Sequence, residues 1–253
     1  MFNNQADRLR ELSRGARPEI QQPGGIALDL YPHQVAAAEY ATVSRRMLLA
    51  DKDGTGRDLS AIAALVETAA MPYLITTPPS LVEQWREDVE RALPSARIID
   101  FTRSADITPE HLAEGDVVLV RHRQLTRSVA ALTGNGFGGM VFDQCQRLAC
   151  RWTQLAEAAR TVVRELAGDA TVVASSSRVA ESPRVLSSAV ELIGALDRHP
   201  RLAAVAHHRT WAGIPDAREI VEELRGDCLL GRGTVAVVAL MGDCEAQGLA
   251  SRH

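Results

Sequence analysis

Residues 48–60 read LLADKDGTGRDLS, which joins a short apolar run, a loop with two glycines and the start of a helix. Gly54 and Gly56 stand where a phosphate-binding loop places the glycines that let backbone N–H groups close around phosphates. Such a loop continues with a lysine that reaches the terminal phosphates and a serine or threonine that holds magnesium. Arg57 and Asp58 occupy these two positions. The stretch therefore has the backbone pattern of a nucleotide-binding loop without its two functional side chains.

Both replacements weaken phosphate binding. The planar guanidinium of Arg57 does not replace a compact ammonium in a closed loop. Asp58 adds a negative charge, whose repulsion by a like charge at 4 Å is about 1 kcal/mol in water and about 4 kcal/mol at an effective dielectric near 20. The same residues also fit a purely structural interpretation, because an acid in the first turn of a helix is favourable and a glycine pair suits a tight turn. The loop alone leaves both interpretations open.

Short apolar segments alternate with helical stretches on both sides of this loop. Predicted strands cover 47–50, 73–76, 97–101, 117–120, 140–142 and 171–174, and predicted helices follow Pro32 and cover 59–69, 81–92, 153–166 and 183–196. Strands that alternate with helices of this length predict an α/β fold, with a mainly parallel sheet covered by helices on both faces. Ligands of such sheets lie at the carboxyl ends of the strands.

The chain divides into three predicted parts. Residues 1–25 form a helix and a linker rich in proline and glycine, and residues 26–197 carry the strand–helix alternation. Residues 198–253 are a mixed C-terminal extension with a helix at 216–224. The apolar run TVAVVAL at 234–240 fits either a strand or a buried helix.

Composition narrows the classes of function. The formal net charge of -4 argues against a general electrostatic grip on nucleic acid, although a local basic patch is compatible with it. No segment resembles a membrane helix or a signal peptide, which predicts a cytoplasmic protein without membrane contact. The cysteines form no Cys-x-x-Cys pair, so we expect reduced thiols and no metal site.

Six segments of the chain resemble known sequence motifs and follow one another in the order of those motifs. They are LYPHQ (30–34), ADKDGTG (50–56), TPPSLV (77–82) with Trp85, DVVLVRHRQL (116–125), VFDQCQR (141–147) and ASSS (174–177). In order and spacing they resemble the "LxPYQ", "ADxMGLGKT", "PTSLVxxW", "DVVITSYxxL", "xxDEAHR" and "TGTP" motifs of Swi/Snf-type helicase-like ATPases of superfamily two. The resemblance covers about residues 28–235 and implies a single RecA-like domain, equivalent to the first of the family's two motor lobes.

The resemblance implies a vestigial nucleotide site. It would consist of Gln34, Gly54, Gly56, Arg57, Asp58, Asp143 and Gln144. In the family, the glutamine of "LxPYQ" reads adenine, the first acid of "DEAH" organises magnesium, and the second positions or deprotonates the attacking water. Asp143 keeps the first acid, but Gln144 cannot act as a base. Because the family's arginine finger also comes from the other lobe, we expect no catalytic residue and no cofactor in this chain.

Two groups of residues are candidates for DNA contact. Thr77, Pro78 and Ser80 lie in a segment that is near the DNA backbone in the resembling family. Arg121, Arg123 and Arg127 follow a predicted strand and would either meet a phosphate backbone or lie in a solvated loop.

Three functions compete on this evidence. The leading one is a non-catalytic interaction module, which docks a partner protein or a protein–DNA complex or associates with itself. The second is the lobe of a split DNA-dependent ATPase that binds Mg-ATP while another chain supplies the second lobe. The third is a weak duplex-DNA-binding module.

Overall fold

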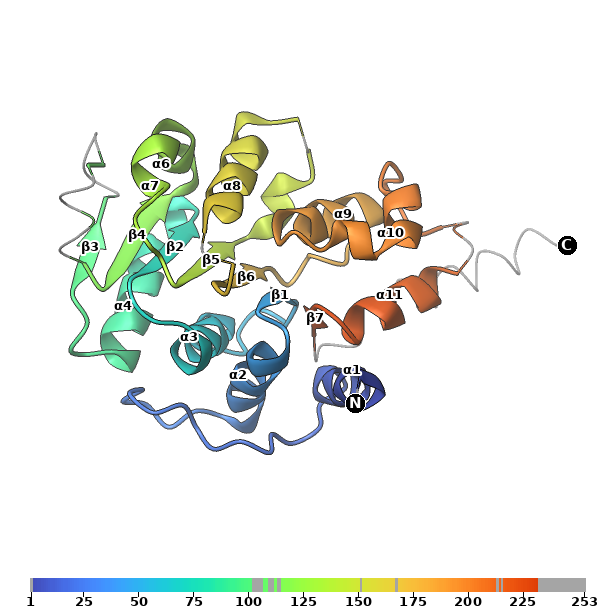
Figure 1. The fold of residues 1–253 in the computed structure, drawn as a ribbon, viewed down its shortest axis with the longest axis horizontal. Coiled ribbons are helices and arrows are strands. Elements are labelled where there is room, and N and C mark those ends of the chain that lie inside the picture. Colours follow the sequence, from blue (N-terminus) through green and yellow to red (C-terminus); the bar gives the residue numbers. More distant parts are fainter. Residues whose placement is uncertain are drawn as a thin grey trace, which may run out of the picture.

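A parallel β-sheet forms the centre of the computed structural model, which describes residues 2–101, 107–108, 112, 115–150, 152–166, 168–212, 214 and 216–231. In this part of the chain the sheet has seven strands in the order β3-β4-β2-β5-β6-β1-β7, and all neighbours run parallel (Figure 1). The strands are β1 (Arg46–Leu49), β2 (Tyr73–Thr77), β3 (Ile98–Asp100), β4 (Val117–Arg121), β5 (Gly139–Asp143), β6 (Thr171–Ser175) and β7 (Leu229–Leu230). The predicted α/β fold is confirmed.

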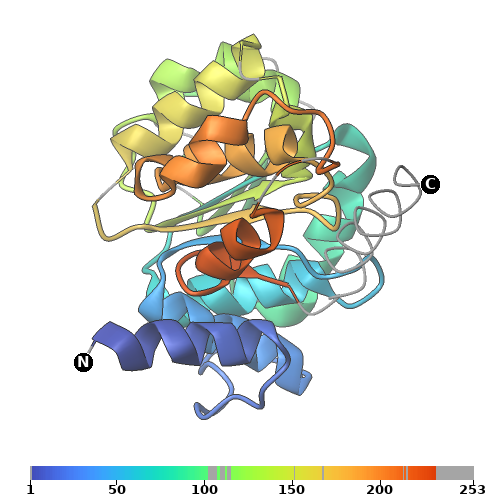
Figure 2. The same cartoon turned by 90° about the vertical axis from the view of Figure 1, so that its right-hand side faces the viewer.

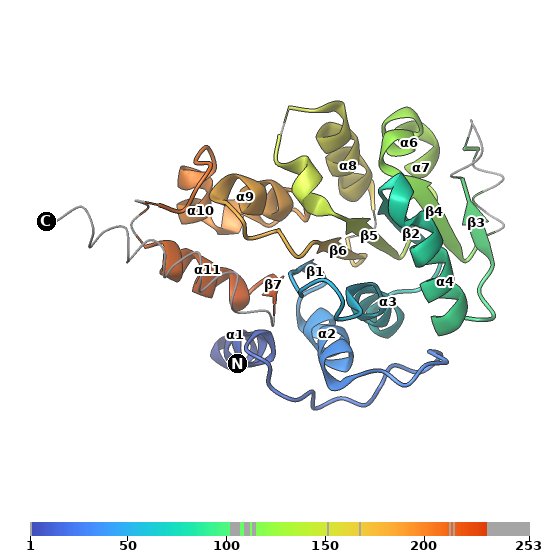
Figure 3. The same cartoon turned by 180° about the vertical axis from the view of Figure 1, so that it is seen from behind.

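Helices cover both faces of the sheet (Figures 1 and 3). One face carries α1 (Phe2–Ser13), α2 (Pro32–Val43), α3 (Arg57–Thr68) and α4 (Val82–Ala92). The other carries α6 (His122–Arg127), α7 (Val129–Leu132), α8 (Gln154–Glu165), α9 (Pro183–Leu192), α10 (Pro200–Val205) and α11 (Ala217–Arg225). Short 3-10 turns lie at η1 (Pro79–Leu81), η2 (Cys145–Leu148) and η3 (Leu196–Arg198).

Alternation along the strands divides the interior into two cores. Leu74 and Phe142 belong to the core under α6, α8 and α9, whereas their neighbours Ile75 and Val141 belong to the core under α2, α3 and α4. Successive side chains of a strand point to opposite faces, so a strand that is buried throughout supplies both cores. This explains why the strands read as continuous apolar runs in the sequence.

The N-terminal end of α2 is fixed by local hydrogen bonds. Pro32 occupies its first turn, where a missing backbone N–H costs nothing. The side chain of Gln34 accepts a hydrogen bond from the N–H of Tyr31 at 2.9 Å. Alanines at the contact between α2 and α3, such as Ala37 and Ala64, are fully buried, which allows the two helices to pack closely.

The N-terminal helix α1 and the C-terminal segment of α11 and β7 meet beside β1 (Figure 2). Strand β7 pairs with β1 through two backbone hydrogen bonds. The N–H of Leu48 donates to the carbonyl of Cys228 at 2.6 Å, and the N–H of Ala50 donates to the carbonyl of Leu230 at 2.7 Å. The side chains of Arg14, just after α1, and Glu222, in α11, form an ion pair at 2.6 Å. Boundaries after residues 25 and 197 remain predictions, and the run at 234–240 lies outside the described residues.

Within the described residues, none of the helices combines the length and the apolar character that crossing a bilayer would require.

Candidate functional site

A polar pocket of about 490 Å³ opens at the carboxyl ends of β1, β2 and β5. Its lining comes from the ends of these strands, from the loops that follow them and from helices α3 and α4: Asp53, Gly54, Gly56, Arg57, Asp58, Pro78, Ser80, Leu81, Gln84, Asp88, Asp143, Gln144 and Arg147. Thus the fold brings the glycine loop and the Asp143–Gln144 motif, which lie far apart in the sequence, to one hollow. We call this hollow the loop pocket.

The backbone of the glycine loop requires its glycines. Gly54 and Gly56 have φ angles of 83° and 75°, in the left-handed region that L residues other than glycine avoid. A Cβ atom on Gly56 would also lie only 2.5 Å from Nε2 of Gln34. Backbone conformation and close packing therefore both require glycine at position 56, just before α3 begins.

Gln34 supports this loop from behind. Its side chain is 2% exposed, accepts the N–H of Tyr31 and donates from Nε2 to the carbonyl of Gly56 at 3.3 Å. The neighbouring His33 places Nε2 2.7 Å from the carbonyl of Thr55. Both side chains thus connect the start of α2 to the loop, and the amide of Gln34 is already used within the protein.

Arg57 is held against the inner wall of the loop pocket. Its side chain is 8% exposed and donates from Nε to Oγ of Ser175 at 2.9 Å. The terminal nitrogen NH1 donates to the carbonyl of Asp51 at 2.8 Å and to Oδ1 of Asp53 at 3.0 Å. The guanidinium therefore links the β1 loop to the end of β6, and three of its hydrogen bonds go to the protein itself.

Asp58 brings a buried carboxyl group to the same pocket. It lies in the first turn of α3, is 6% exposed and accepts a hydrogen bond from Nε2 of Gln84 at 2.5 Å. Burial, followed by the nearby charge of Asp143, raises the pKa of Asp58 from 3.8 to about 7. At neutral pH this carboxyl group therefore titrates, although a free aspartate would be fully ionised.

Asp143 is the better stabilised member of this carboxyl pair. Its Oδ2 accepts hydrogen bonds from Thr77 Oγ1 at 2.9 Å and from Trp85 Nε1 at 3.1 Å, and its Oδ1 accepts the N–H of Gln144 at 2.8 Å. Burial still raises its pKa. Because three donors favour the ionised form of Asp143, the proton that the pair retains resides on Asp58.

Gln144 follows β5 in a conformation that is uncommon outside glycine, with a φ angle of 53°. Its Oε1 accepts a hydrogen bond from Nε2 of Gln146 at 2.6 Å. An amide has no proton-accepting group of useful basicity, so the position after Asp143 offers no general base.

The candidate DNA residues divide into internal and surface positions. Thr77 is fully buried and donates its hydroxyl to Asp143, and Pro78 is also buried. Ser80 is exposed at the rim of the loop pocket. Thr77 is therefore a structural residue of the pocket, and only Ser80 of this group presents a side chain to solvent.

The three arginines lie at the end of β4 and on the helix that follows. Arg121 ends β4 and is half-buried, whereas Arg123 and Arg127 are exposed on α6. Residues 122–127 form helix α6 and not a loop, while Arg123 and Arg127 are solvated as one of the two alternatives expects, and His122 turns inward. Its ring stacks on Phe142 at 4.6 Å, and burial together with Arg147 lowers its pKa to about 4. The buried histidine fixes α6 against the sheet.

Sequence reasoning missed several partners of the pocket. Gln84, Trp85 and Ser175 hold Asp58, Asp143 and Arg57 respectively. Trp85 is fully buried, and its indole N–H donates to the carboxylate of Asp143. Its spacing within the "PTSLVxxW"-like segment was a usable signal, whereas nothing in the sequence indicated that Ser175 would meet Arg57.

Comparisons with solved structures identify this architecture. The Sulfolobus solfataricus SWI2/SNF2 ATPase core in complex with dsDNA matches 85% of this chain and 47% of its own, with a TM-score of 0.65 and 19% identity. The Sulfolobus solfataricus SWI2/SNF2 ATPase core domain, a second solved structure, matches 90% of this chain and 49% of its own, with a TM-score of 0.63 and 19% identity. The fold is that of a RecA-like SWI2/SNF2 ATPase lobe. The helicase domain of Pyrococcus furiosus Hef matches less closely, with a TM-score of 0.51 over 64% of this chain and 36% of its own at 18% identity.

Sequence comparison shows a distant similarity over part of the chain. No protein-family model matches the chain. The DNA repair and recombination protein RAD54B of Mus musculus is 31% identical over 114 residues, which cover 40% of this chain and 13% of the mouse protein. The chain is thus distantly related to that protein, and it spans about half the length of the two archaeal ATPase cores.

Proposed function

We propose that this chain is a non-catalytic SWI2/SNF2-like lobe, a pseudo-ATPase that acts as an interaction module for a protein partner or a protein–DNA complex. The observation that carries the proposal is the buried carboxyl pair of Asp58 and Asp143 in the loop pocket. A pocket for polyphosphate needs cations and N–H donors directed at the ligand. The loop keeps the glycines of a phosphate-binding loop, but the side chains that face the pocket include two buried carboxyl groups.

The charges around the loop pocket support this proposal. Carboxyl groups come from Asp53, Asp58, Asp88 and Asp143, and guanidinium groups come from Arg57 and Arg147. The guanidinium of Arg57 is bound to a carbonyl, a hydroxyl and a carboxylate of the protein, so a phosphate would have to displace these partners. A polyphosphate would also meet the charge of Asp143, and a deprotonated Asp58 would add to that repulsion.

The absence of a base at Gln144 supports the non-catalytic part of the proposal. Phosphoryl transfer depends on positioning and charge stabilisation by a lysine, a metal-binding hydroxyl, a base and an arginine finger. The corresponding positions here hold Arg57, Asp58 and Gln144. Each replacement removes a different contribution, so restoring one of them does not restore hydrolysis.

Calorimetric titration with Mg-ATP tests the proposal. We expect no binding isotherm at millimolar Mg-ATP. We also expect no rise in melting temperature, whereas a ligand that binds and is present at 100 times its Kd would stabilise the protein by about 2.7 kcal/mol. The informative variant is Arg57→Lys with Asp58→Thr, which should gain ATP binding without hydrolysis. Gln144→Glu serves as the matched control and should remain without binding.

Micromolar ATP affinity of the unchanged chain would contradict the proposal. It would instead favour the ATP-binding lobe of a split, DNA-dependent ATPase. The partner is tested separately, by capturing the tagged chain from its native cells and by light scattering. A monomer that captures neither protein nor DNA would contradict the interaction role.

For DNA we propose at most weak contact by the chain alone, through Arg123 and Arg127 on α6. The archaeal core with a similar fold was solved with dsDNA. This chain carries a net charge of -4, and its exposed arginines on α6 are few. We propose a reducing compartment, the cytoplasm, and the free thiols of Cys145, Cys150 and Cys228 support this proposal.

A further inference from the structure

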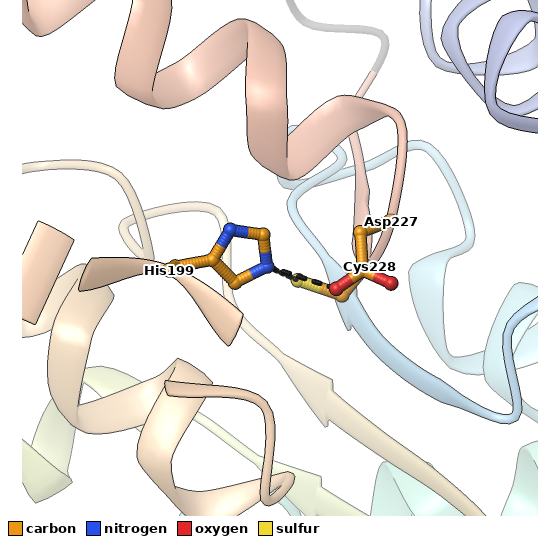
Figure 4. A group of neighbouring side chains, drawn as sticks. All are labelled: His199, Asp227 and Cys228. Carbon is orange, nitrogen blue, oxygen red and sulfur yellow. Dashed lines mark hydrogen bonds and ion pairs between the residues drawn. The ribbon is translucent and has the colours of Figure 1, made fainter. Parts of the chain in front are cut away.

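Three side chains of metal-ligating type meet beside the last strand of the sheet (Figure 4). His199 stands at the junction of η3 and α10, and Asp227 and Cys228 form the turn between α11 and β7. Nε2 of His199 lies 2.8 Å from Oδ2 of Asp227 and 4.0 Å from Sγ of Cys228. We propose that these three residues form a binding site for a single zinc ion, independent of the loop pocket and of its proposed function.

The donor set and its spacing fit zinc. Zinc accepts thiolate, imidazole and carboxylate ligands at about 2.0–2.3 Å, so ligand atoms around a tetrahedral ion are about 3.3–3.6 Å apart. The ligand atoms of His199, Asp227 and Cys228 all lie within 4.8 Å of one another. The separations of 2.8 and 4.0 Å from Nε2 of His199 bracket the tetrahedral value, and the separation between the ligand atoms of Asp227 and Cys228, at most 4.8 Å, must close by up to about 1.2 Å for all three to share one ion.

The protein backbone holds the sulfur ligand firmly. The carbonyl of Cys228 accepts the N–H of Leu48 in β1, and its own N–H donates to the carbonyl of Leu224 at 2.8 Å. Cys228 is therefore fixed to the sheet on one side and to α11 on the other. A metal bound here would connect the α11–β7 segment to the η3–α10 junction.

One side of the cluster is accessible. His199 and Cys228 are buried, while the side chain of Asp227 is 34% exposed. An ion could therefore enter past Asp227, and a water molecule could complete its coordination, as in zinc sites with three protein ligands. Burial of the nitrogen and sulfur ligands protects the site from exchange with solvent elsewhere.

Arg198 competes for the same carboxylate. Its Nε and NH2 atoms donate to Oδ2 of Asp227 at 3.1 and 2.8 Å, and its side chain is 51% exposed. A zinc ion would take this oxygen from Arg198 and from His199. The exposed guanidinium can turn into solvent, so we expect Arg198 to weaken zinc binding without preventing it.

Titration of the reduced, chelator-treated full chain with Zn²⁺ and with Co²⁺ tests the proposal. We expect one ion per chain and, with Co²⁺, the intense near-ultraviolet absorption of a thiolate ligand. Cys228→Ala should abolish this absorption and weaken zinc binding by more than about 100-fold, beyond the cost of changing an outer-shell group. The exposed Cys150 provides the control, because Cys150→Ala should change neither result.

Two further variants guard against a folding failure of Cys228→Ala. Asp227→Ala, at a half-exposed position, should weaken zinc binding more than about tenfold and retain the fold by circular dichroism. Arg198→Ala should strengthen binding by about two- to fivefold, since it removes an exposed ion pair. Absence of stoichiometric binding, Co²⁺ binding without thiolate absorption, or affinity unchanged in both Asp227→Ala and Cys228→Ala would overturn the proposal.

Discussion

Three charged side chains on the inner wall of the loop pocket and two on α6 lie in contrasting surroundings. In the pocket, Arg57, Asp58 and Asp143 are buried and hydrogen-bonded to other protein groups. On α6, Arg123 and Arg127 are exposed. A charged group that is committed to internal partners contributes to the fold and resists ligand binding, whereas an exposed one contributes little stability and is free to meet a partner. Substitutions in the two regions should therefore differ in kind.

The largest effect is expected from Trp85→Ala. Trp85 is fully buried and donates to the carboxylate of Asp143. Its removal creates a cavity and takes a donor from a buried charge, so the free energy of unfolding should fall by about 3–5 kcal/mol. Urea denaturation followed by circular dichroism measures it. A loss below about 1 kcal/mol would show that the pocket wall is not part of the stable core.

Asp58→Asn should change the pH dependence of stability. The folded-state pKa of Asp58 is raised to about 7 from an unfolded value near 3.8, so the folded protein binds the extra proton between these values. Stability from this group is therefore full below pH 4, falls as pH rises through 7 and is level above it. The total is at most about 4 kcal/mol.

The Asp58→Asn variant should lack this fall in stability between pH 4 and 7, because asparagine does not ionise. It should equal the parent chain in stability near pH 4 and exceed it near pH 8.5, as measured by urea denaturation across this range. Asp53, which lies at the pocket edge and has a pKa lowered chiefly by Arg57, supplies the control. Asp53→Asn should not give a gain at high pH, and a gain of equal size there would contradict the assignment to Asp58.

Arg57→Met should destabilise the protein moderately. The methionine keeps an apolar stem but loses the three hydrogen bonds to Ser175, Asp51 and Asp53. We expect a loss of about 1.5–3 kcal/mol, as for hydrogen bonds of a charged group. Arg147→Met, another change of a pocket arginine, is the comparison. Equal and negligible losses for both would mean that Arg57 is not an internal structural residue.

The smallest effect on stability is expected on α6. Arg123→Ala with Arg127→Ala should stay within about 0.5 kcal/mol of the parent chain. Any duplex-DNA affinity, expected at about 10⁻⁴–10⁻⁶ M, should fall further, and the salt dependence should decrease by up to about two phosphate contacts. Fluorescence anisotropy with a short labelled duplex measures both. Nanomolar binding at physiological salt would reverse the contrast between the two regions.

The sequence predicted elements with clear periodicity better than it predicted side-chain partners. The six longer strands were located because each is an apolar run between turn residues, and the ends of the helices agree within a few residues. Strand β7 was missed because Leu229 and Leu230 form too short a run to be distinguished from a loop. Helix α6 was missed because five of its six residues are polar, and this composition gives no sign of the side that packs on the sheet.

Within the site, the residues that line the pocket were easier to predict than the partners that their side chains bind. The glycine positions, Arg57 and Asp58 were recognisable from their order after β1. That Arg57 would bind Ser175 depends on β6 lying next to β1, which is a property of the topology. Likewise, His199 and Asp227 are 28 residues apart and meet only because α11 returns the chain to the η3–α10 junction.

The position of β1 in the sheet has a consequence for how the chain acquires its structure. Both neighbours of β1, strands β6 and β7, are translated long after it, and β7 comes last among the described strands. During synthesis, at about 5–20 residues per second, the apolar residues of β1 must wait several seconds for their first partner strand. Non-local pairing of this kind slows folding and exposes the apolar surface of aggregation-prone intermediates. The nascent chain should therefore depend on chaperones until residues near 230 have left the ribosome.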